Sequence, residues 1–142
     1  MRYPEQFVIP MRRDLTQYGV TEARTPEEVD AVLSQGSVLM IVNSVCGCAA
    51  GKARPAVGMA LQHRVRPEKA ATVFAGADME ALAHLREGKL AAVPPSSPSM
   101  ALFVNGEPVF ILHRRDIEMR EAPQIAELLV QAFEKHCAPV AG

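Results

Sequence analysis

The stretch Ser37-Val-Leu-Met-Ile-Val-Asn-Ser-Val-Cys-Gly-Cys-Ala-Ala-Gly-Lys-Ala-Arg-Pro55 joins an apolar segment to two cysteines that are one residue apart. Residues 38–42 are all large and apolar without alternation, which is typical of a strand covered on both faces. The alanines and the lysine that follow the cysteines are strong helix formers. The stretch therefore predicts a buried strand, a turn, and a helix that Asn43 and Ser44 can cap.

This arrangement places Cys46 and Cys48 at, or just before, the first turn of the predicted helix. The free backbone N–H groups and the positive end of the helix dipole favour an anion there, and a thiolate is an anion. Lys52 and Arg54 follow about a turn later and add positive charge. We therefore expect an exposed cysteine at this point to have a lowered pKa and to be a better nucleophile near neutral pH.

The composition limits the class of protein. The chain has 142 residues, of which 49% are hydrophobic, and this is enough for one domain, residues 1–142, with a genuine core. A net charge of -1 argues against a nucleic-acid-binding protein, because such domains carry a basic excess. No apolar run reaches the length of a membrane span, and the first residues lack the apolar core of an export signal. We expect a cytoplasmic protein whose cysteines stay reduced.

Helical and strand patterns alternate along the rest of the chain. Helices are expected over 10–18, from Thr25-Pro26-Glu27-Glu28, after the cysteines with a kink at Pro55, after an N-cap at Asp78, and from Pro123. Strands are expected over 20–24, 70–75, 100–104 and 108–113, with a tight hairpin at Asn105-Gly106 and a turn at 116–118. The order βαβ followed by ββα predicts an α/β fold with a largely parallel sheet.

The segment Val42-Asn-Ser-Val-Cys-Gly-Cys-Ala-Ala-Gly-Lys-Ala-Arg-Pro-Ala56 resembles the active-site segment of the bacilliredoxins. Further similarities to that family cover most of the chain and lie at 10–15, 24–29, 74–76 and 94–99. Bacilliredoxins are small thioredoxin-like proteins with a Cys-X-Cys motif, found in bacteria that use bacillithiol in place of glutathione. The resemblance implies a thioredoxin-like α/β fold: a central mixed sheet flanked by helices, a core of about residues 25–136, and an N-terminal helical extension.

The resemblance also implies a thiol–disulfide oxidoreductase that removes bacillithiol from mixed disulfides on client proteins. Cys46 would be the attacking thiol and Cys48 the second cysteine of the motif. Pro98 would be a cis-proline that faces the active site, and Ser97 would offer its backbone to the substrate. We expect no bound cofactor. Bacillithiol is the expected thiol co-substrate, and bacillithiolated proteins, rather than nucleic acid or membrane, are the expected partners.

Thiol–disulfide exchange requires a thiolate, a reachable sulfur on the target and a stable leaving thiolate. We expect Cys46 to attack the bacillithiol sulfur, after which a second bacillithiol or Cys48 regenerates the site. Gly47 supplies the backbone freedom for a disulfide ring that is tighter, and so easier to reduce, than the ring of a Cys-X-X-Cys protein. Lys52 and Arg54 are candidates to tune Cys46 or to contact the malate carboxylates of bacillithiol.

Other interpretations of the same residues stay open. The chain is also compatible with a general disulfide isomerase, or with a redox-sensing thioredoxin-like binding domain that reacts once and stops. A further interpretation is that both cysteines are buried hydrophobic residues at the end of the strand, with no role in a reaction. A zinc site is the remaining alternative, and its ligands would be Cys46, Cys48, His136 and Cys137. The arginine pair at 114–115 is expected on the solvated surface, with contact to an anionic partner as the alternative.

Overall fold

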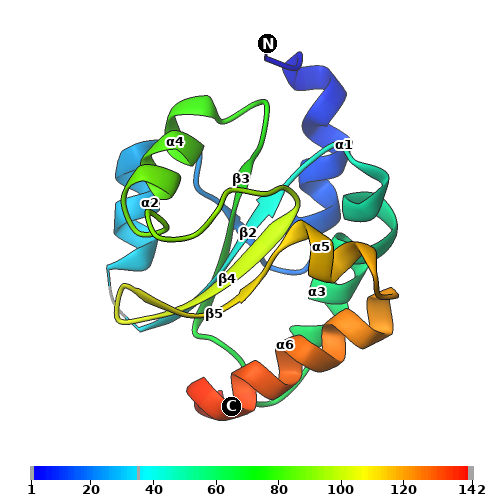
Figure 1. The fold of residues 1–142 in the computed structure, drawn as a ribbon, viewed down its shortest axis with the longest axis vertical. Coiled ribbons are helices and arrows are strands. Elements are labelled where there is room, and N and C mark those ends of the chain that lie inside the picture. Colours follow the sequence, from blue (N-terminus) through cyan, green and yellow to red (C-terminus); the bar gives the residue numbers. More distant parts are fainter. Residues whose placement is uncertain (1, 35, 141–142) are drawn as a thin grey trace.

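The computed structural model describes residues 2–34 and 36–140. Its helices are α1 (Glu5–Thr16), α2 (Pro26–Leu33), the π-helical turn η1 (Ala49–Ala53), α3 (Arg54–Ala60), α4 (Met79–Glu87), α5 (Arg114–Glu118) and α6 (Ala122–His136). Its strands are β1 (Thr21–Glu22), β2 (Ser37–Asn43), β3 (Lys69–Phe74), β4 (Ser99–Val104) and β5 (Glu107–Leu112) (Figure 1).

The strands form one mixed sheet in the order β1-β3-β2-β4-β5. Strands β1 and β2 both pair with β3 in parallel, whereas β4 is antiparallel to β2 and to β5. All seven residues of β2 are buried, as the unbroken apolar run predicted. Strand β2 therefore lies at the centre of the sheet and carries the turn with the two cysteines at its carboxyl end.

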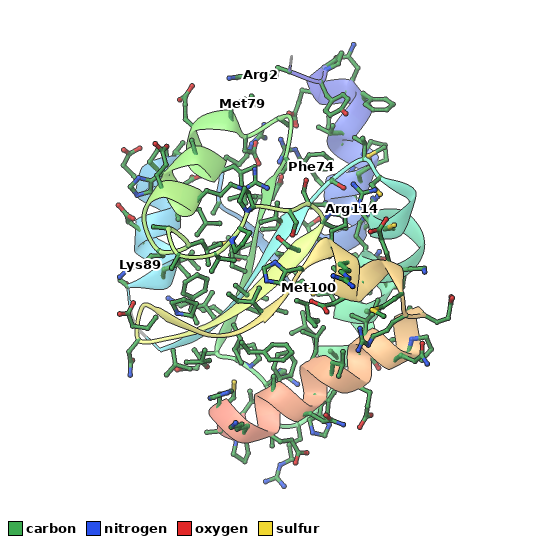
Figure 2. All side chains as sticks on the ribbon, in the orientation of Figure 1. Arg2, Phe74, Met79, Lys89, Met100 and Arg114 are labelled. Carbon is green, nitrogen blue, oxygen red and sulfur yellow. The ribbon has the colours of Figure 1, made fainter. Side chains whose placement is uncertain are left out.

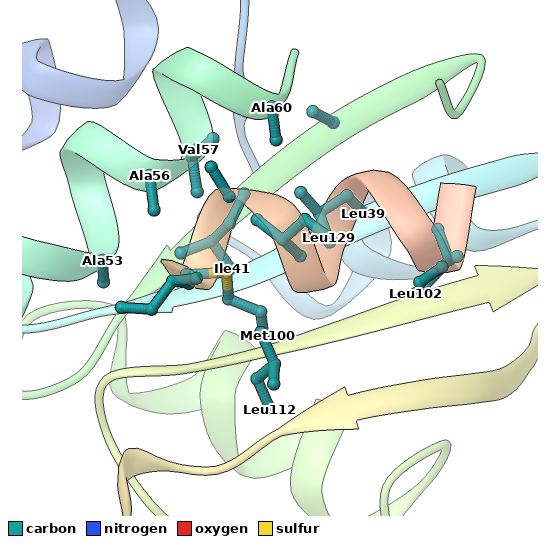
Figure 3. Packing of buried hydrophobic residues seen from close by; sticks show 14 of the residues in the cluster. Leu39, Ile41, Ala53, Ala56, Val57, Ala60, Met100, Leu102, Leu112 and Leu129 are labelled. Atoms are coloured by element: carbon teal, nitrogen blue, oxygen red, sulfur yellow. The ribbon is translucent and has the colours of Figure 1, made fainter. Parts of the chain in front are cut away.

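Helices cover both faces of the sheet (Figure 1). On one face Leu39 and Ile41 of β2 belong to a hydrophobic cluster with α1, α3 and α6, of which Figure 3 shows the packing around Leu129. On the other face, residues Val38 and Met40 belong to a second cluster with α2 and α4. Successive side chains of a strand point to opposite faces, so β2 contributes to both clusters and joins the two halves of the core.

Several boundaries agree with the sequence signals. Thr25 caps α2 with its hydroxyl, which accepts the N–H of Glu28 at 3.1 Å. The hairpin between β4 and β5 turns at Asn105 and Gly106, whose φ angles are 50° and 83°. Two successive positive φ angles are the requirement of the tight hairpin turn that Asn-Gly predicts, because these two residues tolerate the left-handed region.

Helix α1 is longer than expected. It begins at Glu5, so Pro10 lies inside the helix rather than at its start. Proline removes a backbone donor at that point, but Pro10 is exposed, while Val8 and Leu15 are fully buried. The packing of this buried face outweighs the local cost of the proline, because most helical stability comes from tertiary contacts.

An ion network fixes α1 to the sheet. Arg12 is buried, and its guanidinium donates to both carboxylate oxygens of Asp78 at 2.8 and 2.9 Å and to Glu5 and Glu22. The Asp78 carboxylate also accepts the N–H of Phe74 at 2.9 Å. Asp78 precedes α4, as expected, but its side chain makes no capping hydrogen bond to that helix. Asp78 is therefore the N-cap residue, as predicted, but its carboxylate is engaged by Arg12 instead of the first turn of α4.

The kink predicted at Pro55 takes the form of a change of helix type. The residues just before α3 form the π-helical turn η1, and the N–H of Arg54 donates to the carbonyl of Ala49, five residues earlier. A π-turn inserts an extra residue where a proline disturbs the regular ladder of hydrogen bonds. The helix then ends at Ala60, and Val65, which was expected to continue it, pairs with Pro139 in an isolated bridge.

Residues 116–118, expected as a turn, belong to the short helix α5. Its start is fixed by Asp116, whose carboxylate accepts the N–H of His113 at 2.9 Å. Within the described part of the chain, no helix combines the length and the apolar character needed to cross a membrane.

Candidate active site

Cys46 opens the helical turn that follows β2. Its carbonyl oxygen accepts the N–H groups of Ala49 and Ala50 at 3.0 and 3.2 Å. Its Sγ accepts the N–H of Cys48 at 3.3 Å. An N-cap residue has this arrangement, with its carbonyl starting the helix and its side chain taking a free N–H. The sulfur of Cys46 therefore occupies the place of the capping oxygen, where a negative charge is stabilised.

Asn43 and Ser44, the residues predicted to cap this helix, form hydrogen bonds in the turn just before it. The hydroxyl of Ser44 accepts the N–H of Cys46 at 3.2 Å, and Asn43 Oδ1 accepts the N–H of Ser44 at 2.9 Å. Asn43 also donates to the carbonyl of Met11 at 3.2 Å. Asn43 and Ser44 thus hold the turn before Cys46 and connect it to α1, while Cys46 itself is the cap.

The two thiols of the motif have opposite pKa shifts. Partial burial raises the pKa of Cys46, but the N–H and S–H groups of Cys48 and the guanidinium of Arg114 outweigh this effect, so the pKa lies below its ordinary value. Burial also raises the pKa of Cys48, and the hydrogen bond and charge of Cys46 and the carboxylate of Glu118 raise it further. Cys46 is therefore the more acidic thiol of the pair, and Cys48 is the less acidic one.

Arg114 is the cation whose charge lowers the pKa of Cys46. The sequence pattern did not assign it to the site. It begins α5 (Figure 2), and its Nη1 donates to the carbonyl of Ser97 at 3.2 Å. The hairpin contained a usable signal. Leu112 pairs with Met100 across the two strands, so residues just after β5 must lie beside residues just before β4. The Asn-Gly turn therefore brings Arg114 to the loop that holds Ser97.

Lys52 and Arg54, the cations expected beside Cys46, have other partners. Lys52 Nζ donates to the carbonyl of Glu118 at 2.7 Å. Arg54 is only 3% exposed, and its guanidinium donates to Asp14 at 2.9 Å and to the carbonyl of Ser44 at 3.4 Å. Burial lowers the pKa of Arg54, and Asp14 partly offsets this. Arg54 is thus an interior brace of the turn before Cys46, and the expectation that it meets a substrate is corrected.

A groove lies in front of Cys46 and has a volume of about 310 Å³. It is lined by Tyr3, Ser44, Val45, Cys46, Ala75, Gly76, Ser97 and Arg114. The bond between Ser97 and Pro98 is cis, as the resemblance implied. Tyr3 was not anticipated: its N–H donates to the carbonyl of Gly76 at 2.8 Å, which fixes the aromatic ring as one wall. Gly47 is exposed, and the space beside its α-carbon is open.

The four residues considered for zinc form two separate pairs, Cys46 with Cys48 and His136 with Cys137. Cys137 follows α6 and lies beside Ser37 at the start of β2, whereas Cys46 follows the other end of that strand. A seven-residue strand separates the two ends by about 20 Å. Among residues 2–34 and 36–140, three or more His, Cys, Asp or Glu side chains do not gather in a way that could hold a metal ion.

Comparisons with known proteins agree with this geometry. Residues 3–137 match the model of a family described as disulphide isomerase. A bacilliredoxin of Salinibacter ruber is 53% identical over 96% of this chain and 82% of its own length. One from Koribacter versatilis is 46% identical over 99% of this chain and 97% of its own. A variant thioredoxin from Halobacterium salinarum, at 19% identity, superposes with a TM-score of 0.56 over 85% of this chain and 93% of its own. The expected thioredoxin-like fold is confirmed.

Proposed function

Because this chain belongs to the bacilliredoxin family and is a thiol–disulfide oxidoreductase with a thioredoxin-like fold, we propose that its substrate is a mixed disulfide between bacillithiol and a client protein. One observation carries the proposal: the Sγ of Cys46 accepts a backbone N–H at 3.3 Å and borders a groove that it shares with Arg114. A stabilised thiolate beside a cationic groove suits attack on a small anionic thiol.

The first step transfers bacillithiol to the enzyme. The thiolate of Cys46 attacks the bacillithiol sulfur, a new disulfide forms to Cys46, and the bond to the client cysteine breaks. The client thiolate leaves and takes a proton from solvent. A groove of about 310 Å³ suits a small thiol better than a folded client, which favours attack on the bacillithiol sulfur.

The residues around the groove orient the substrate in this proposal. Arg114 replaces Lys52 and Arg54 as the cation that we expect to meet the carboxylates of bacillithiol, because its side chain is 44% exposed at the groove. The carbonyl of Ser97 is engaged by Arg114, so the N–H of Ser97, next to Pro98, is the backbone group assigned to the substrate. The open space beside Gly47 leaves an approach to the motif.

The second step regenerates the enzyme. A second bacillithiol attacks the disulfide on Cys46, forms the disulfide of two bacillithiol molecules and releases the Cys46 thiolate. Alternatively Cys48 attacks Cys46, releases bacillithiol and closes an internal disulfide. Either route conserves the two electrons of the exchange, and neither needs a bound cofactor.

Cysteine variants test the assignment. After mixing with a bacillithiolated client, Cys46→Ala is expected to show no transfer by intact mass. Cys48→Ala is expected to accept bacillithiol and to stall as an adduct on Cys46 until free bacillithiol is added. Cys137→Ala serves as the control and should behave as the wild type, since Cys137 lies at the other end of β2. An adduct on Cys46→Ala would contradict the proposal, and a single turnover in excess bacillithiol would favour a sensor.

A second candidate function is disulfide isomerisation, which the description of the matched family model favours. An isomerase must attack protein disulfides, so its activity is measured as the recovery of active enzyme from a scrambled disulfide-bonded substrate. We expect this recovery to be slow relative to removal of bacillithiol, because a groove of about 310 Å³ suits a small thiol better than a folded protein. Faster isomerisation than bacillithiol removal would reverse the order of the two functions.

A further inference from the structure

Helix α5 presents a cation and an anion to the two cysteines from one short element. Arg114 and Glu118 are one turn apart, and Arg114 Nε lies 3.4 Å from Glu118 Oε2. The same Oε2 atom accepts the thiol of Cys48 across 3.9 Å. The guanidinium at the groove lowers the pKa of Cys46, and the carboxylate raises the pKa of Cys48. The two charges of α5 therefore act in opposite directions on neighbouring thiols.

The position of Glu118 is fixed from the cysteine-bearing segment itself. Lys52 in η1 donates to the main-chain carbonyl of Glu118 at 2.7 Å, and its ammonium is also 3.9 Å from the carboxylate of Glu121. The charged groups that face Cys48 are thus Cys46, Arg114 and Glu118, with Lys52 bound to the backbone end of Glu118.

We propose that Glu118 is a positioning residue that holds Cys48 as a protonated thiol, so that the adduct on Cys46 is left for an incoming small thiol rather than for Cys48. This inference rests on the proposed function, because it concerns how the adduct on Cys46 is resolved. It assigns the choice between the two regeneration routes to one carboxylate on α5.

The charges explain why Glu118 matters most after the first step. While Cys46 is a thiolate, its hydrogen bond and its charge keep the pKa of Cys48 high. Once Cys46 forms a mixed disulfide, both contributions vanish. Burial and Glu118 then remain as the causes that keep Cys48 protonated, and Arg114 opposes them. Glu118 is the remaining negative charge that restrains Cys48 at the moment when its attack becomes possible.

A chromogenic disulfide isolates this step without bacillithiol. The Cys46 thiolate attacks 5,5′-dithiobis(2-nitrobenzoate), which forms a mixed disulfide and releases one thionitrobenzoate. Cys48 then loses its proton to solvent and attacks the Sγ of Cys46. The Cys46–Cys48 disulfide forms, the mixed disulfide breaks and a second thionitrobenzoate leaves. The reagent gains the two electrons that the two thiols lose.

Variants are compared in a Cys137→Ser background, so that the cysteines of the motif alone report. Glu118→Gln is expected to release the second thionitrobenzoate about threefold faster at pH 7. Loss of the carboxylate lowers the pKa of Cys48 and leaves more thiolate, and the lower basicity of that thiolate returns part of the gain in rate. Glu127→Gln is the matched control, because it removes the same charge from a carboxylate on α6 that bonds Gln131. It should leave the second release unchanged.

Arg114→Gln is expected to change the release rates in the opposite direction to Glu118→Gln. It should slow the first release, because the pKa of Cys46 rises, and also the second, because Arg114 lowers the pKa of Cys48. The pH profile of the second release should move to lower pH in Glu118→Gln and to higher pH in Arg114→Gln. A merely structural role for α5 would not produce shifts of opposite direction.

The outcomes separate this inference from the proposed function. A second release that is unchanged or slower in Glu118→Gln overturns the role of Glu118, whatever the result with bacillithiolated clients. Faster release with a pH profile shifted downward supports it even if bacillithiol proves not to be the substrate. Intact mass should then show a shorter-lived adduct on Cys46 in Glu118→Gln than in Glu127→Gln.

Discussion

The two ends of β2 each carry a partly buried free thiol, Cys46 at the carboxyl end and Cys137 beside the amino end. Hydrogen bonds and the charge of Arg114 lower the pKa of Cys46. Burial raises the pKa of Cys137, the hydroxyl of Ser37 opposes this, and the carboxylate of Glu68 raises it again. The same residue type therefore has opposite chemistry at the two ends of one strand.

The polarity of the adjoining helices explains the difference. Cys46 begins a helix, so its sulfur accepts the N–H of Cys48, and its carbonyl accepts the N–H groups of Ala49 and Ala50. Cys137 ends α6, and its own N–H donates to the carbonyl of Phe133 at 2.7 Å. The positive end of a helix dipole stabilises a thiolate and the negative end does not. The start of a helix and the charge of Arg114 at Cys46, and the deeper burial of Cys137, together decide which cysteine reacts.

The largest expected effect concerns the bracing of the Cys46 end. Arg54→Ala removes buried hydrogen bonds to Asp14 and to the carbonyl of Ser44, and should lower the free energy of unfolding by about 2–3 kcal/mol. This is about 30- to 150-fold in the unfolding equilibrium.

Arg66→Ala is the matched change near Cys137, and removes a hydrogen bond to the carbonyl of His63. It should cost less than about 1 kcal/mol. Urea unfolding measures both, and equal costs would contradict the asymmetry.

The next effect is the alkylation of the two thiols. At pH 7, iodoacetamide should modify Cys46 at least about tenfold faster than Cys137, because a lowered pKa leaves more thiolate at that pH. As the pH falls, labelling of Cys46 should decline only on passing below its lowered pKa. Labelling of Cys137 should rise only at a pH above the ordinary range of a cysteine pKa, because the pKa of Cys137 is raised. Peptide mapping by mass spectrometry follows both sites. The urea-unfolded chain is the control, in which the two rates should converge.

The smallest expected effect reduces the difference in reactivity between Cys46 and Cys137 by making Cys137 more reactive. Glu68→Gln removes a charge that raises the pKa of Cys137, so alkylation of Cys137 at pH 7 should increase about twofold. The amide of glutamine can still accept the N–H of Ser37, which the carboxylate now accepts at 3.1 Å. Labelling of Cys46 in the same sample is the internal reference and should not change. A slower reaction of Cys137 would show that another group controls its pKa.

Most of the helices, strands and turns could be predicted from local patterns in the sequence. The unbroken apolar run of β2, the Asn-Gly hairpin and the capping signal at Thr25 are local patterns, and the structure confirms each. The resemblance placed Pro98 correctly as a cis residue. These features depend on residues close together in the chain, where turn chemistry and periodicity determine the conformation.

The surroundings of the thiols were harder to predict because they depend on distant residues. Lys52 and Arg54 are near Cys46 in sequence, yet one bonds α5 and the other turns into the interior toward Asp14. Arg114 and Tyr3 border the groove from segments far away in the chain. Which charge faces a thiol is decided by the packing of elements, and composition or spacing does not encode that directly.

The docking of Tyr3 has a practical consequence for handling the protein. Its main-chain N–H is bonded to Gly76 at the rim of the groove, whereas the chain near residue 140 lies at the far end of the molecule (Figure 1). An affinity tag fused ahead of Arg2 would begin two residues before a wall of the groove that holds Cys46, and it should hinder incoming thiols there. Kinetic work is therefore better served by a fusion placed after the last helix, where the added polypeptide points away from the chemistry.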